Sequence, residues 1–268
     1  MEFIEDKEFY TFIPVDVLMF IFLIILSYVY WNVSKRVGFQ LLYLTLFSIV
    51  IAHIITLYFP YLYTNEEHIP LTVISVQATM TFFAFFMPLA KNRSQLVLTI
   101  GLPLSFSLFL LLMTEVAVFS IIGGIFIGGF IIYTFYRTLD WIGSMPEPYL
   151  FAFSMILPLF LAAIIYPRMD YLLYPGILLG SGIGVTLEIF KVRLNNENNH
   201  VAKRLVGLLI GIGGLVIFYG IDQLVFPLLP FPELTKGIVV GLWITLLVPG
   251  LLIMLKLYGR KGKSRVFS

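Results

Sequence analysis

Long apolar runs separated by short polar segments fill most of this chain. Each run is about 18–22 residues long, close to the ~20 residues with which an α-helix crosses a hydrocarbon core of ~30 Å. The sequence therefore predicts an all-α polytopic membrane protein with about nine transmembrane helices, over residues 14–31, 38–59, 71–90, 95–113, 116–136, 148–166, 171–190, 205–226 and 237–255.

The polar segments are too short for a soluble domain, and they divide the chain into five parts. These are an outer N-terminal segment (1–13), a transmembrane helical region (14–190), a cytoplasmic loop (191–204), a C-terminal transmembrane extension (205–255) and a basic tail (256–268). Three pairs of glycines spaced four apart favour close packing between helices. They are Gly124 and Gly128, Gly180 and Gly184, and Gly237 and Gly241.

Basic residues lie almost wholly on alternate polar segments, and only Lys7, Arg168 and Lys236 fall on the opposite side. Cytoplasmic loops of membrane proteins carry the excess of lysine and arginine. We therefore expect a multi-pass protein of the cytoplasmic membrane, with its N-terminus outside and its C-terminus in the cytoplasm.

Composition narrows the possible chemistry. Hydrophobic residues make up 60% of the chain, charged residues make up 12%, and the mean hydropathy is +0.99, which excludes an ordinary soluble domain. Without cysteine there is no disulfide, thiol nucleophile or thiolate metal site, and we expect no cofactor and no metal. The basic residues border apolar runs, where they meet lipid headgroups, so membrane lipids are expected partners and nucleic acid is not.

Ionisable residues inside the apolar runs are few, and such residues often mark function. His53 is the deepest, and a neutral histidine bonded between helices competes there with a functional role. Glu188 has Lys191 three residues further on, and this spacing favours an ion pair between them at the membrane interface.

The C-terminal part carries a recognisable sequence pattern. It combines Gly-x-x-Leu-Gly, Leu-Glu, a basic pair and Gly-Leu-Trp-x-Thr, at Gly176–Gly180, Leu187–Glu188, Lys203–Arg204 and Gly241–Thr245. This pattern resembles the three-helix extension of a Gram-positive subgroup of bacterial PAP2 (phosphatidic acid phosphatase type 2) membrane phosphatases. The resemblance extends more weakly from about residue 38, and it implies a PAP2-like six-helix core over about 38–190, with flanking helices.

The resemblance also implies where a phosphatase site would lie. The family uses Lys-x6-Arg-Pro, Pro-Ser-Gly-His and Ser-Arg-x5-His-x3-Asp at the outer ends of core helices. Lysine and arginine hold the phosphate, one histidine attacks phosphorus with an aspartate orienting it, and the other histidine protonates the leaving group.

In this chain the matching positions lack those groups. Phe59-Pro60 stands for Arg-Pro, and Gly123-Gly124 matches a double glycine that follows the third motif. Counting from these anchors places neutral or apolar residues at the chemical positions: Ala52, Phe59, Ser75, Gln77, Leu110, Val116 and Ser120. The remaining polar side chains nearby are possible ligand contacts: His53, His68, Thr72 and Glu115. Ser75 and Gln77 are also explained as a polar pair packing between helices.

Three functions remain open. The first is a catalytically degenerate PAP2-like protein of the cell envelope that binds a lipid or serves as a subunit with another envelope membrane protein. The second is an active phosphatase for phosphatidate, phosphatidylglycerophosphate or undecaprenyl pyrophosphate, rewired around His53 or His68. The third is a lipid transporter or scramblase, which needs a polar groove open to the bilayer.

Overall fold

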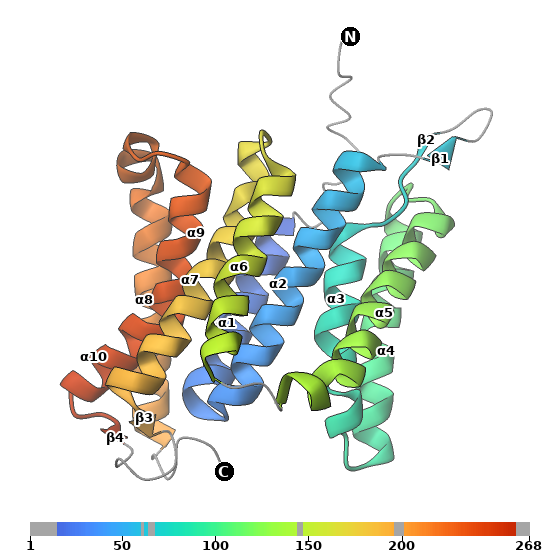
Figure 1. The fold of residues 1–268 in the computed structure, drawn as a ribbon. Coiled ribbons are helices and arrows are strands. Elements are labelled where there is room, and N and C mark those ends of the chain that lie inside the picture. Colours follow the sequence, from blue (N-terminus) through green and yellow to red (C-terminus); the bar gives the residue numbers. More distant parts are fainter. Residues whose placement is uncertain (1–14, 60–61, 64–67, 144–146, 196–200, 261–268) are drawn as a thin grey trace. The chain divides into compact units, whose positions relative to one another are not determined.

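The chain folds into long helices joined by short connections (Figure 1). The computed structural model describes residues 15–59, 62–63, 68–143, 147–195 and 201–260. The long helices of this part are α1 (Val15–Asn32), α2 (Lys35–Tyr58), α3 (Ile74–Ala84), α4 (Arg93–Met113), α5 (Val118–Gly143), α6 (Glu147–Ile165), α7 (Leu173–Leu187), α8 (Val201–Val225), α9 (Pro232–Leu242) and α10 (Val248–Met254).

Shorter elements complete the described part. Two π-helical segments extend α7 and join α9 to α10, namely η3 (Glu188–Val192) and η5 (Trp243–Leu247). The 3-10 turn η1 (Met87–Leu89) follows α3, η2 (Met169–Leu172) precedes α7, and η4 (Phe226–Leu228) follows α8. Two small antiparallel pairs link β1 (Leu62–Tyr63) with β2 (His68–Ile69), and β3 (Leu194–Asn195) with β4 (Gly259–Arg260).

Every predicted apolar run coincides with a helical stretch in the described part of the chain, with α9, η5 and α10 forming the last one. Six stretches are long and apolar enough to cross a membrane, and three more are shorter apolar helices, at Val17–Asn32, Ile74–Leu89 and Phe151–Ile165. The chain is therefore an all-α, multi-pass membrane protein.

Contacts divide the chain into two compact units. Unit 1 is formed from residues 1–22 and 51–140, so it holds the start of α1 and the last third of α2 with α3, α4 and most of α5. Unit 2 is formed from residues 23–50 and 141–268, and it holds the end of α1, the start of α2 and α6 to α10.

Hydroxyl groups within the helices bond back to their own backbone. The hydroxyls of Thr45, Thr56, Thr79 and Ser107 each donate to the carbonyl four residues earlier, at 2.7–2.9 Å. Lipid offers no hydrogen-bond partner, so a polar group in a spanning helix must be satisfied within the protein. These helices can therefore carry hydroxyls at low cost.

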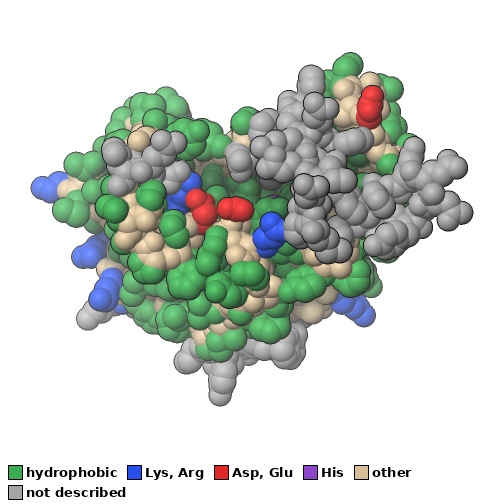
Figure 2. Space-filling model, turned by 90° about the horizontal axis from the view of Figure 1, so that it is seen from above, with side chains coloured by type: hydrophobic (Ala, Val, Ile, Leu, Met, Phe, Trp, Pro, Cys, Tyr) green, Lys and Arg blue, Asp and Glu red, His purple; other side chains and the backbone are tan. Residues whose placement is uncertain are grey.

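Many large apolar side chains are exposed on the described helices. On α8 the row Val201, Leu205 and Leu209 is 72%, 55% and 70% exposed. Figure 2, a view from above onto the ends of the helices, shows acidic and basic side chains among the hydrophobic ones. A soluble protein rarely exposes apolar surface on this scale, whereas a surface that meets lipid chains requires it.

Within unit 2, α7 and α9 pack closely because glycines face each other. A methyl group added to Gly241 would lie 2.6 Å from the backbone nitrogen of Ser181, and one on Gly237 would lie 2.8 Å from that of Ile177. Gly180 likewise meets the backbone of Ile238. The prediction that these glycines serve helix packing is confirmed.

A second glycine face, on α8, receives two tryptophans. Added methyl groups on Gly211 and Gly214 would collide with the rings of Trp31 and Trp243 respectively. The indole nitrogen of Trp243 donates to the carbonyl of Gly211 at 3.0 Å. The absence of side chains at these positions therefore seats α8 against the end of α1 and against η5.

Candidate functional site

The double glycine of the predicted phosphatase site lies where α5 passes the start of α3 in unit 1. A methyl group on Gly124 would lie 3.2 Å from the carbonyl oxygen of Val73 and 3.3 Å from the backbone nitrogen of Gln77. One on Gly123 would collide with the carbonyl oxygen of Leu71. The two glycines thus allow α5 to approach the backbone that carries the predicted second motif.

Polar side chains at this crossing are occupied by structural hydrogen bonds. Thr72 Oγ1 donates to Gln77 Oε1 at 2.9 Å, and Gln77 is fully buried. Ser120, also fully buried, donates its hydroxyl to the carbonyl oxygen of Pro70. These contacts fix the segment before α3 to the first turns of α3 and α5.

Two positions that would carry charged phosphatase groups hold apolar side chains in one cluster. Leu110, at the arginine position, is buried together with Val73, Val76 and Ile121. Val116, at the nucleophile position, packs against the same cluster. The structure therefore brings these two positions together, but the environment it builds is hydrophobic.

The other predicted site residues of unit 1 lie in varied environments. Ala52 and Ser75 are buried, and their carbonyls accept from Thr56 and Thr79 in the same helices. His53, in α2, is also buried. Phe59, one residue beyond α2, is 66% exposed.

Two predicted polar contacts remain. Glu115 is exposed in the turn between α4 and α5. His68 is in β2, where its backbone pairs with Tyr63; its side chain lies outside the described part. The expectation that Phe59, Gln77 and Val116 converge on one pocket stays a prediction.

These contacts limit what the crossing can do chemically. Residues 94–136 contain no lysine, arginine or histidine, so α4 beyond Arg93 and most of α5 supply no cation. A phosphate monoester carries about −1.5 to −2 charges at neutral pH and needs charged or N–H donors. The hydrophobic cluster around Leu110 and Val116 provides neither donors nor a nucleophile.

A groove of about 370 Å³ lies elsewhere in unit 1, along η1 and α4. Its walls are mostly apolar, with Gln95 and Thr99 as polar members, and Gln95 Oε1 accepts from the backbone nitrogen of Lys91 at 2.8 Å. None of the predicted site residues lines this groove. Its chemistry suits a hydrocarbon chain better than a charged headgroup.

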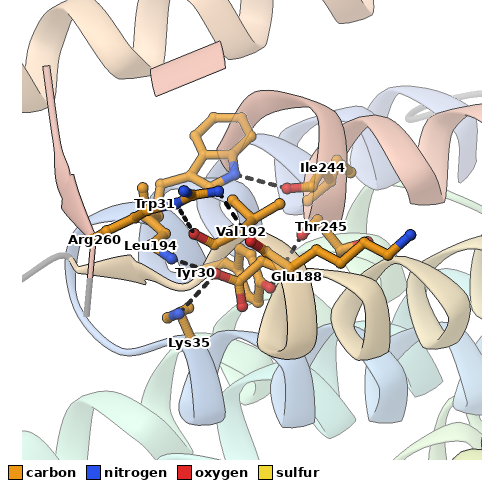
Figure 3. Close-up of polar contacts among 10 residues, drawn as sticks. Tyr30, Trp31, Lys35, Glu188, Val192, Leu194, Ile244, Thr245 and Arg260 are labelled. Carbon is orange, nitrogen blue, oxygen red and sulfur yellow. Dashed lines mark hydrogen bonds and ion pairs between the residues drawn. The ribbon is translucent and has the colours of Figure 1, made fainter. Parts of the chain in front are cut away.

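Unit 2 contains a polar cluster that the sequence analysis missed (Figure 3). Glu188 is fully buried, and its Oε1 accepts from Lys35 Nζ and from the backbone nitrogen of Leu194, both at 2.8 Å. The predicted pairing of Glu188 with Lys191 is therefore wrong. The chain becomes π-helical at Glu188, so the i,i+3 geometry of an α-helix, on which that pairing relied, no longer holds.

Carbonyls of η5 accept hydrogen bonds from the end of α1 in the same cluster. Trp31 Nε1 donates to the carbonyl of Ile244 at 2.8 Å, and the Tyr30 hydroxyl donates to that of Thr245 at 3.3 Å (Figure 3). Arg260 donates to the carbonyls of Val192 and Lys191, both at 3.1 Å, at the end of η3. A π-helix does not align its groups as an α-helix does, and side chains use the carbonyls left available.

Comparison with protein families gives one match. Residues 172–260 match the model of the PAP2 superfamily phosphatase, transmembrane extension. No curated protein and no solved structure matches the chain. The match runs from the last residue of η2 to β4, including Glu188, Trp243 and the α7–α9 glycines, and it confirms the resemblance to the PAP2 superfamily in this part of the chain.

Proposed function

We propose that this chain is a PAP2-like membrane protein without phosphatase activity. It acts in the cell envelope by binding a membrane lipid or another envelope membrane protein. The observation that carries the proposal is the apolar cluster of unit 1, in which Leu110 and Val116 occupy positions that resemble those of the phosphate-binding arginine and the nucleophilic histidine.

Several groups that phosphate hydrolysis would need are absent from this cluster together. Removing a single general acid or base commonly lowers a rate by ~10²–10⁴-fold, and removing one charge-stabilising donor costs a similar factor. Such losses are not additive. Even so, Gln77 and Ser120 already bond to neighbouring protein groups, so these side chains do not replace the missing nucleophile and cations.

Phosphate release by the purified full chain tests this proposal. Phosphatidate, phosphatidylglycerophosphate and undecaprenyl pyrophosphate are each supplied in detergent micelles, and inorganic phosphate is measured against a protein-free blank. We expect no release above the blank. Release that survives Gln77→Ala but disappears in His53→Ala or His68→Ala would establish a rewired phosphatase instead.

The proposal includes a location and an orientation. The excess of basic residues on one set of connections supports insertion in the cytoplasmic membrane with the N-terminus outside and the C-terminus in the cytoplasm. In this orientation the α4–α5 turn faces outward, and β3, β4 and the start of α8 lie on the cytoplasmic side.

A further inference from the structure

Buried nitrogen donors gather near Tyr258 in unit 2. Asn32, the last residue of α1, is 3% exposed, and its Oδ1 accepts from the Tyr258 hydroxyl at 2.6 Å. Its Nδ2 is buried, and no acceptor for it lies among the residues that the structure describes. Arg204, in the first turn of α8, has a buried Nε that likewise lacks an acceptor in the described ranges.

Both side chains are near the same hydroxyl. Burial raises the pKa of Tyr258, and the positive charge of Arg204 opposes this rise, so the guanidinium lies within electrostatic range of the phenol. On α8, a methyl group added to Gly207, three residues after Arg204, would lie 3.5 Å from the Tyr258 oxygen. Arg204 therefore belongs to the face of α8 that packs on this end of unit 2.

A buried N–H donor without an acceptor costs about 1–3 kcal/mol, and such groups in a native protein call for an explanation. Here two donors of this kind occur together, and one of them is cationic. An acceptor with negative charge would satisfy both through charge-assisted hydrogen bonds. Glu188, the acid of the cluster in Figure 3, bonds to neither donor: its Oε1 accepts from Lys35 and from the Leu194 backbone, and its buried Oε2 has no hydrogen-bond partner among the described residues.

The surroundings indicate which anion fits. Val201, Leu205 and Leu209 form an exposed apolar row on the same helix as Arg204, and Lys203 beside it is exposed. A basic site next to an apolar helix surface, at the end of a spanning helix, suits a lipid headgroup with its chains along the helix.

We propose that Asn32 and Arg204 bind the phosphate group of an acidic phospholipid whose acyl chains lie along Leu205 and Leu209. Asn32 contributes its amide N–H and Arg204 its guanidinium, while the Tyr258 hydroxyl holds the amide in place. This site lies in unit 2 and does not depend on the proposed loss of catalysis in unit 1.

Lipid competition with the full chain in vesicles tests the proposal. Trp31 precedes Asn32, and its ring faces Gly211 of α8. The chain has two further tryptophans, Trp141 and Trp243, so the quenching that is lost in a Trp31→Phe variant is the part that reports lipid near the site. The chain is reconstituted in phosphatidylcholine containing increasing amounts of phosphatidylglycerol with brominated chains, which quench tryptophan. We expect phosphatidylglycerol to bind several-fold more tightly than phosphatidylcholine, and inorganic phosphate not to displace it.

Two substitutions that each remove one positive charge, one at the site and one beside it, provide a matched comparison of lipid preference. Arg204→Gln should lower the preference for phosphatidylglycerol more than ten-fold, the factor corresponding to the ~1.5–3 kcal/mol of a hydrogen bond between charged groups. Lys203→Gln removes the same charge from an exposed neighbour and should lower the preference about five-fold at most, the factor corresponding to the ~1 kcal/mol of one basic residue near an anionic membrane. Asn32→Asp keeps the acceptor for Tyr258 but replaces the Nδ2 donor by a negative oxygen, and it should abolish the preference.

Defined results would overturn the proposal. Equal losses in Arg204→Gln and Lys203→Gln would mean that diffuse surface charge, and not this site, selects the lipid. No preference in the unmodified chain would exclude the site, and displacement by inorganic phosphate would identify a soluble anion as its ligand. If Arg204→Gln does not fold, Asn32→Asp decides, since retained preference in that variant contradicts the proposal.

Discussion

Glu188 and Lys35 carry opposite charges across a buried contact of 2.8 Å, in which Glu188 is fully buried and the Lys35 side chain is 23% exposed. Replacing Lys35 by methionine keeps the side-chain volume but leaves a buried carboxylate without its counter-ion. Breaking such a pair from one side costs about 3–5 kcal/mol. We therefore expect Lys35→Met to lower the thermal unfolding temperature of the protein in detergent substantially.

Lys191→Met is the control for this prediction, because Lys191 is an exposed lysine three residues from Glu188. It should change the unfolding temperature little, since exposed ion pairs contribute about 0–1 kcal/mol. The double variant Lys35→Met with Glu188→Leu should recover part of the loss by removing the unpaired charge. Equal destabilisation by Lys35→Met and Lys191→Met would contradict the pairing described here.

For single residues, the sequence predicted where helices pack together better than it predicted which side chains bond to each other. The double glycine Gly123-Gly124 correctly marked the place where α5 packs against the start of α3. Glycine can be read directly from the sequence, and it is needed where two backbones approach closely. The hydrogen bond from Ser120 to the Pro70 carbonyl could not be predicted, since it joins residues 50 positions apart. The pair of Lys35 and Glu188 spans 153 positions, and Lys191 offered a nearer but wrong partner.

At the scale of helices, the contact between α7 and α9 depends on glycines that face each other. Gly241→Ala would place a methyl group 2.5 Å from the carbonyl oxygen of Ile177 and 2.6 Å from the nitrogen of Ser181. Both neighbours are backbone atoms of a packed helix and cannot move independently, so the helices must separate. We expect a loss of about 1–3 kcal/mol, the usual cost of overpacking, measured as a lower unfolding temperature.

Gly213→Ala is the matched control, because it adds the same methyl group within a helix where nothing lies within 4 Å. Alanine favours a helix over glycine by about 0.8–1.0 kcal/mol in soluble hosts, so this variant should be neutral or slightly stabilising. A comparable loss in Gly213→Ala would attribute the effect to the glycine backbone and not to the α7–α9 contact.

Helix positions followed from hydropathy, whereas some helix ends did not. The run predicted at 205–226 corresponds to a helix that begins at Val201, and the run predicted at 38–59 to one that begins at Lys35. Both helices carry a pair of basic residues in the first turn. Hydropathy assigns such residues to loops, although their long side chains can extend from a helix end toward water. The π-helical segments η3 and η5 escaped prediction because nothing in their residue types separates them from α-helix.

At the scale of the whole molecule, the predicted fold class is confirmed, because apolar length and composition determine it directly. The predicted six-helix core over about 38–190 stays a prediction, since its residues are divided between units 1 and 2. The family match covers the C-terminal extension, where glycines, tryptophans and Glu188 leave a specific pattern. The motifs that would identify the core are those in which this chain has lost the charged residues.

The orientation of the molecule can be tested because the chain contains no cysteine. Single cysteines are placed at position 65, between β1 and β2, and at position 197, between β3 and α8. In intact cells the cysteine at 65 should react with a membrane-impermeant thiol reagent, and the cysteine at 197 should react only after the membrane is permeabilised. The physical reason is the positive-inside rule, since the connection that holds position 197 is flanked by Lys191, Arg193, Lys203 and Arg204. Labelling in the reverse order would invert the topology, and it would place the proposed phospholipid site in the outer leaflet.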